Sequence, residues 1–141
     1  MIYFGFTIGP VVATIEQARK TRELWAASFV FSYFMKHLLE QLQGFGAILA
    51  PNDTSLKNAK PQYGAGIWPD RCFLEISDPK KAEALQKQLP QLVENALEAI
   101  NAKLGGGQMT QLKSYFRCYA CSFDDAKDTF TPGTDAEKKL K

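Results

Sequence analysis

The densest group of charged side chains in this sequence is a basic cluster of Arg19, Lys20 and Arg22, which follows shortly after Gly9. Cations beside a strand–helix junction are typical of phosphate binding, because the free N–H groups at the start of a helix already favour anions. Ion pairs along a solvated helix, such as Glu16 with Arg19, explain the same pattern without a ligand. The residues alone leave both interpretations open.

A second pattern overlaps the cluster. Thr21, Trp25, Ser28 and Ser32 are spaced by four, three and four residues, which places them on one face of a helix. Hydroxyl groups there can bond back to the carbonyls of their own helix, or they can contact a ligand held against it. The sequence therefore predicts a mildly polar stripe with a structural or a binding role.

Residues that often hold metals or act as nucleophiles are few. Cys118 and Cys121 have the spacing of half a zinc or redox motif, but residues three apart on a strand point to opposite faces. Neither thiol has a base partner, and the single histidine, His37, has no acid or thiol at a useful spacing. We expect packing roles for both thiols, a reducing cytoplasm, and neither a metal site nor a catalytic residue in this chain.

Paired carboxylates would indicate two-metal nucleotide chemistry, and the sequence lacks them. The first predicted strand ends Thr7-Ile8-Gly9 without an acid, and the region before the third strand offers only Asp53 and Asp70, far apart. Two metal ions need closely placed carboxylates. We therefore expect the chain to be inactive with ATP on its own.

Alternating strands and helices must position these residues. Runs rich in aromatic and β-branched residues predict four strands, and apolar periodicity predicts two long helices. The strands are expected at Met1–Ile8, Gly46–Pro51, Arg71–Ser77 and Ser114–Phe123, and the helices at about Val11–Gln43 and from Asp78 to Gly105. The order βαββαβ is that of the α+β ferredoxin-like fold, a four-stranded antiparallel sheet with two helices on one face.

Each predicted helix has an irregular feature. The first would be about 50 Å long, so a kink or break is expected, and Pro90 predicts a kink near Gln88 or two shorter helices in the second. Between Leu24 and Leu42 the first helix is apolar on more than one side. Such a helix is normally buried all round, here by its own loop and partner helix or by another domain or subunit.

Length and composition indicate one globular domain, since the chain has 141 residues and a net charge of only +2. We place it at residues 1–125, with 126–141 as a linker or the truncated start of the next segment. The loop 52–68 is long for a compact domain and is expected to be a lid or an insertion. No signal peptide is visible, and the apolar run from Leu24 to Met35 is shorter than the ~20 residues that span a bilayer.

One stretch is more specific than these patterns. The segment F-x-I-G-P-V, followed by A-R-K-T-R-E-L-W-A-A-S-F-x-x-S-Y, resembles the opening of the large, polymerase- and cyclase-like subunit of Cmr-type (type III-B) CRISPR RNA-guided interference complexes. The matching residues are Phe6, Ile8, Gly9, Pro10, Val11, Ala18, Arg19, Lys20, Thr21, Leu24, Trp25, Ser28 and Ser32. A second match is Pro69-Asp70-Arg71. Val12 stands where the family usually has glutamine, so we expect no polar side-chain contact there.

The resemblance implies a role that spacing does not show. The chain would be the N-terminal, first palm-like domain of that subunit, a copy without metal-binding acids that supports ATP binding while the second palm domain makes cyclic oligoadenylate. The candidate nucleotide-binding residues are Gly9, Lys20, Arg22, Ser28 and Ser32. The candidate interface residues are Trp25, Phe29 and Tyr33.

The same resemblance implies the partners and cofactors. The partners would be the remaining domains of the subunit, other effector subunits and, through the complex, guide and target RNA, with a role in antiviral defence and no membrane. ATP and a divalent metal would belong to the parent protein, and no cofactor to this fragment.

A different class of function stays open, an independent RNA-binding module of the RRM type, which has the same fold. Phe4, Phe6, Tyr115 and Tyr119 would be its stacking platforms. Against this alternative, the third strand lacks the glycine- and aromatic-rich pattern that such modules carry there.

Overall fold

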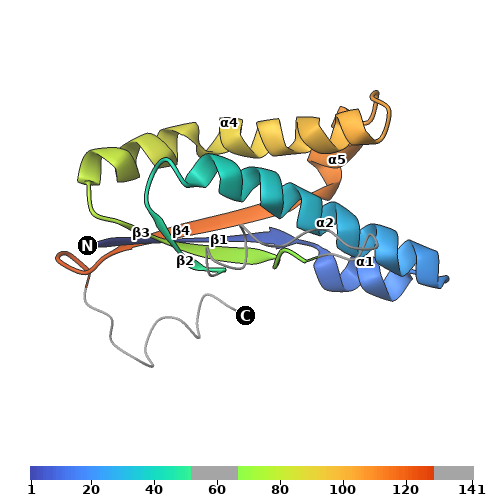
Figure 1. Cartoon of the computed structure of the whole chain (residues 1–141), viewed down its shortest axis with the longest axis horizontal. Coiled ribbons are helices and arrows are strands. Elements are labelled where there is room, and N and C mark those ends of the chain that lie inside the picture. The colour runs from blue at the N-terminus through green and yellow to red at the C-terminus, as the bar shows by residue number, and fades with distance from the viewer. Residues whose placement is uncertain (52–66, 129–141) are drawn as a thin grey trace.

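A four-stranded antiparallel sheet with two long helices side by side on one face forms the centre of the computed structural model, which describes residues 1–51 and 67–128 (Figure 1). In chain order the elements are β1 Ile2–Gly9, α1 Val11–Gln17, α2 Thr21–Leu42, β2 Ala47–Ala50, β3 Arg71–Ile76, α4 Pro79–Lys103, α5 Met109–Tyr115 and β4 Arg117–Asp124. The strand order is β2-β3-β1-β4. The predicted α+β class and ferredoxin-like arrangement are confirmed, with two short helices, α1 and α5, in addition.

The alternation of side chains along β1 sets the two faces of the sheet. Phe4, Phe6 and Ile8 are buried toward the helices, whereas Tyr3 and Gly5 point to the opposite face, since successive strand residues alternate. The neighbouring strands keep this register, because β1 pairs antiparallel with both β3 and β4. One face therefore builds the core and the other is left open.

The core lies between the sheet and the two long helices. The second half of α2 supplies its largest fully buried side chains, and α4 supplies a single apolar stripe, as predicted. The buried helix residues are Phe31, Phe34, Met35, Leu38, Leu39 and Leu42 of α2 and Ala82, Leu85, Leu92, Ala96, Leu97 and Ile100 of α4. In the described part of the chain, no helix combines the length and apolar character that a membrane crossing requires.

The break predicted in the first helix occurs between α1 and α2. Residues 18–20 are not helical, and the Glu23 carboxylate accepts hydrogen bonds from the backbone N–H groups of Arg19 at 2.8 Å and of Lys20 at 3.3 Å. These bonds satisfy two amides just before the first turn of α2. The helical spacing that would pair Glu16 with Arg19 is lost here.

The sequence predicts a kink or two shorter helices at Pro90, and the division into two helices is wrong, because α4 is one helix there. Asp78 caps α4 by accepting a hydrogen bond from the N–H of Lys80 at 2.9 Å, and the helix then continues to Lys103. Pro90 is exposed, with buried Leu85 and Leu92 on either side of it. Burial of this stripe offsets the backbone hydrogen bond that proline cannot make.

The fourth strand begins at Arg117 and not at Ser114, because α5 occupies residues 109–115. Gly105, Gly106 and Gly107 all have positive φ and end α4 as predicted, since glycine adopts this conformation without strain. The chain then turns into α5, and Phe116 behind it packs against the ring of Phe31 at 5.2 Å between centroids. Phe116 thus closes the core, and neither Tyr115 nor Phe116 starts a strand.

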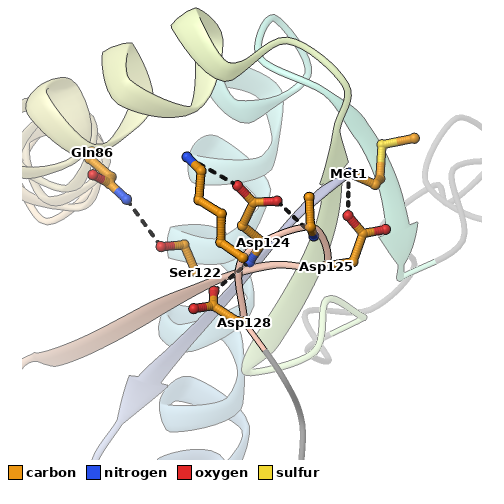
Figure 2. A network of polar contacts seen from close by, with 8 residues as sticks. Met1, Gln86, Ser122, Asp124, Asp125 and Asp128 are labelled. Atoms are coloured by element: carbon orange, nitrogen blue, oxygen red, sulfur yellow. Dashed lines mark hydrogen bonds and ion pairs between the residues drawn. The ribbon is translucent and has the colours of Figure 1, made fainter.

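A polar network closes the end of β4, as Figure 2 shows. The Met1 amino group pairs with Asp125, and the Asp124 carboxylate accepts from the N–H of Ala126 at 3.1 Å and pairs with Lys127 at 3.4 Å. The hydrogen bond from Ala126, and then Lys127, hold the pKa of Asp124 below its usual value. The turn after β4 is therefore part of the folded domain, while 52–66 and 129–141, including most of the predicted lid, lie outside the described residues.

Candidate binding faces

The start of α2 presents two exposed cations, Lys20 and Arg22, which we call the cationic start of α2. The ion pairs within residues 1–51 and 67–128 include neither of them. Glu23 already accepts from two backbone amides at this helix end. Anion binding here would therefore depend on the two side chains more than on the helix terminus itself.

Ser32 and Ser28 have different surroundings, although they lie one turn apart. Ser32 is 4% exposed, and its hydroxyl oxygen accepts hydrogen bonds from the N–H groups of Ile67 at 2.9 Å and Trp68 at 2.8 Å. Ser28 is half-buried and has no hydrogen bond to another described residue through its side chain. Ser32 thus ties α2 to the segment that leads into β3, whereas Ser28 has no such contact within the described residues.

The five predicted nucleotide-binding residues do not converge on one point. Lys20 and Ser32 are 12 residues apart, about 18 Å along the axis of α2. Gly9 ends β1 opposite Arg117, and among the described residues beyond its chain neighbours only the N atom of Val11 lies within 4.0 Å of where its side chain would start. The structure gathers Lys20 and Arg22 at one helix end and leaves open space at Gly9, whereas Ser32 serves the fold.

The predicted interface residues form an aromatic stripe along α2, made of Trp25, Phe29, Tyr33 and His37. Trp25 is 56% exposed, the Phe29 and Tyr33 rings stack at 5.6 Å, and the His37 ring meets Tyr33 edge-on at 4.6 Å. The spacing of four residues brings consecutive members together. His37 is absent from the sequence prediction, although the same spacing of four would have identified it.

The described residues do not fit a divalent metal. No group of three His, Cys, Asp or Glu side chains there is placed to hold an ion. The Asp70 carboxylate lies 3.4 Å from Arg71, and the backbone carbonyl of Asp70 accepts from the N–H of Ile8 at 2.9 Å. Asp70, beside the end of β1, thus uses both its side chain and its backbone carbonyl in contacts within the fold.

The three thiols are free and occupy different environments. Cys118 pairs with Ile8 across the strands and shares its core side, whereas Cys121 pairs with Gly5 and is exposed on the open side. The predicted opposite orientation of these two cysteines is confirmed. Burial raises the pKa of the Cys72 thiol to about 12 and that of Cys118 to about 11, so both are neutral thiols near pH 7.

Most of the stacking platforms predicted for an RRM-type module are not available. Phe4 and Phe6 are 3% exposed, because both point to the helix side of β1, and Tyr115 belongs to α5. Of the four, only Tyr119 is exposed on the open side of the sheet. The sequence prediction placed Phe4 and Phe6 on the outward side of β1, but they are buried, and the outward aromatic residue of this strand is Tyr3.

A groove of about 720 Å³ lies between α2 and α5. Its walls are mostly apolar and include Val30, Leu112 and Phe116, with the hydrogen-bonded pair of Thr14 and Tyr115 at one end. The groove holds no acid, histidine or cysteine that could do chemistry.

Comparison with known proteins gives the family. The model of the family described as CRISPR-associated protein Cmr2, N-terminal, matches residues 3–104, more than two thirds of the chain. No curated protein matches the chain. The matched region contains both stretches that carried the resemblance, Phe6 to Ser32 and Pro69-Asp70-Arg71. The chain therefore belongs to the family of the N-terminal domain of Cmr2, the large subunit of type III-B CRISPR complexes.

Proposed function

We propose that this domain is a non-catalytic palm-like domain that supports ATP binding during cyclic oligoadenylate synthesis and helps to assemble the Cmr effector complex. Its family membership supports a role inside that complex. The residues Thr7-Ile8-Gly9 at the end of β1 include no acid that could hold a catalytic metal. The acids and the divalent metal would come from outside this chain.

The observation that carries the proposal is the change in burial along α2. No residue before Phe31 is buried, so the first half of the helix extends beyond the core that covers its second half. This exposed half carries both Lys20 and Arg22 and the exposed Trp25. A large aromatic residue next to cations on an uncovered helix is typical of a binding surface.

Each group would have a distinct task. Lys20 and Arg22 would pair with phosphate oxygens, since charge-assisted bonds to phosphate are strong and Arg can bind two oxygens at once. Ser28 would donate a hydrogen bond, and Ser32 would position α2 through its bonds to Ile67 and Trp68. The aromatic stripe would pack on a neighbouring domain of the same subunit or on another Cmr subunit, and guide and target RNA would be met through the complex.

The test uses the parent Cmr2 in its complex, with Lys20, Arg22 and Ser28 changed singly to Ala. After assembly is checked, cyclic oligoadenylate synthesis is measured against ATP concentration. A lost charged contact contributes about 1.5–3 kcal/mol, so the Lys20 and Arg22 variants should need roughly ten- to a hundredfold more ATP. Lys87→Ala, an exposed lysine on α4, is the matched control. Wild-type ATP dependence in all three variants would show that this face is structural.

A further inference from the structure

The face of the sheet opposite the helices carries three exposed aromatic rings. Tyr3 is 38% exposed, Phe73 is 49% exposed and Tyr119 is 61% exposed. They come from β1, β3 and β4, so one ring stands on each of three neighbouring strands. We call this surface the open sheet face.

A hollow of about 340 Å³ lies in the middle of the open sheet face, at Gly5. A side chain at this position would begin only 3.3 Å from both the Phe73 ring and the Cys121 sulfur. Glycine therefore keeps the floor low between these two neighbours, and the Tyr119 ring and Arg71 complete the rim. The shape is a shallow slot with an aromatic wall.

The strand register gives the spacing of the rings. Phe73 pairs with Gly5, and Tyr119 pairs with Thr7, so their Cα atoms are two strands and two residues apart, about 12 Å. Tyr3 is a diagonal neighbour of Phe73, about 8 Å away. Gly5 and Thr7 of β1 lie between Phe73 and Tyr119, so these two rings are separate flat surfaces, whereas Tyr3 pairs directly with the half-buried Phe123 of β4 at the other end of the face.

Charge on the open sheet face is asymmetric. Arg71 lies beside Thr7 and Arg117 beside Gly9, whereas the acid Glu75 lies beside Tyr3 at the other end. The Arg71 guanidinium forms an ion pair with the Asp70 carboxylate at 3.4 Å. The ion pairs of the described ranges do not include Arg117. The end near Gly9 can therefore receive a phosphate.

We infer that the open sheet face binds single-stranded RNA, with bases stacked on Phe73 and Tyr119 and a backbone phosphate at Arg117. Separate aromatic platforms beside arginine are what single strands require, because every base has a flat face to stack and every nucleotide carries a charge. A protein partner would favour an interface centre with few charges, whereas Arg71 and Arg117 lie on this face beside the rings. The surface is on the opposite side of the sheet from α2, so it is independent of the proposed ATP role.

The experiment measures fluorescence anisotropy of labelled U12 and A12 RNA with the 141-residue chain. Phe73→Leu and Tyr119→Leu keep an apolar side chain but remove the ring, and Leu104→Ala, which changes an exposed apolar residue at the end of α4, is the control. We expect each of the first two variants to bind about fivefold or more weakly and the control to bind like wild type. Arg117→Gln should lower the slope of log affinity against log salt by about 0.7. ATP and double-stranded RNA should compete poorly.

Three results would overturn the inference. The first is that neither U12 nor A12 binds at protein concentrations up to millimolar. The second is that Phe73→Leu and Tyr119→Leu bind RNA with the affinity of wild type. The third is that wild type sediments as a dimer, whereas Phe73→Leu and Tyr119→Leu sediment as monomers. The last result would assign the face to a second copy of the chain. Because the changed side chains are exposed, circular dichroism should confirm that all variants fold. Lys20→Ala and Arg22→Ala change residues on α2, on the other side of the sheet. Loss of ATP use in these variants would therefore leave the RNA-binding result unaffected.

Discussion

Replacing Ser32 with Ala tests whether this residue, which matches the family pattern, stabilises the fold instead of binding a ligand. The change deletes one oxygen that accepts two backbone hydrogen bonds, from Ile67 and Trp68, at a site with 4% exposure. A hydrogen bond contributes about 0.5–1.5 kcal/mol net, and an orphaned buried donor costs about 1–3 kcal/mol. Because Ile67 is exposed, water can satisfy its amide, and the full cost applies only to Trp68. We expect a loss of about 1.5–3 kcal/mol.

The assay is urea unfolding of the chain, followed by circular dichroism and by tryptophan fluorescence. Hydrogen exchange at the amides of Ile67 and Trp68 gives a local readout, and both amides should lose protection in Ser32→Ala. Ser28→Ala is the matched control, because Ser28 is half-buried one turn earlier, and its stability should change by less than about 0.5 kcal/mol. Equal stability of Ser32→Ala and wild type, with unchanged exchange, would refute the positioning role.

The remaining predictions concern the thiols, the end of β4 and catalysis. Cys121 should react rapidly with a thiol reagent at pH 7.5, whereas Cys72 and Cys118, whose pKa values burial raises to about 12 and about 11, should react only after unfolding; three fast thiols would contradict this. The pKa of Asp124 is lowered in the folded state by the hydrogen bond from Ala126, so its stabilising contribution is present above the usual aspartate pKa and is lost as pH falls through the lowered value. Asp124→Asn should remove this part of the acid dependence, and an unchanged pH profile would show that the contact is irrelevant. The chain alone, incubated with ATP and Mg²⁺ or Mn²⁺, should form neither cyclic oligoadenylate nor ADP, and either product would reveal acids that the sequence analysis missed.

Sequence reasoning predicted the fold because its evidence is local. The aromatic and β-branched residues of β1, the start of α4 at Asp78 and the glycines at residues 105–107 are each read from a few neighbouring residues. The errors arose where tertiary contacts override local signals. Phe116 looks like a strand residue but fills the space beside Phe31, and burial of the α4 stripe carries the helix through Pro90.

The binding faces were predictable only in part. The basic cluster that includes the cationic start of α2 was found from its density of charge, whereas Trp25, Phe29 and Tyr33 of the aromatic stripe were named through the resemblance. The role of Ser32 could not be predicted, because its partners Ile67 and Trp68 are distant in sequence. Phe73 and Tyr3 were missed since a strand pattern alone does not say which side of a sheet the helices will cover.

The most direct test of the central claim is the dissociation constant of ATP for the assembled Cmr complex, measured with a non-reactive ATP analogue. The double variant Lys20→Ala/Arg22→Ala is compared with wild type and with Lys87→Ala, all in complexes of verified composition. If the exposed half of α2 supports nucleotide binding, the double variant should bind at least about a hundredfold more weakly, and Lys87→Ala should bind like wild type. Equal dissociation constants in all three complexes would contradict the account.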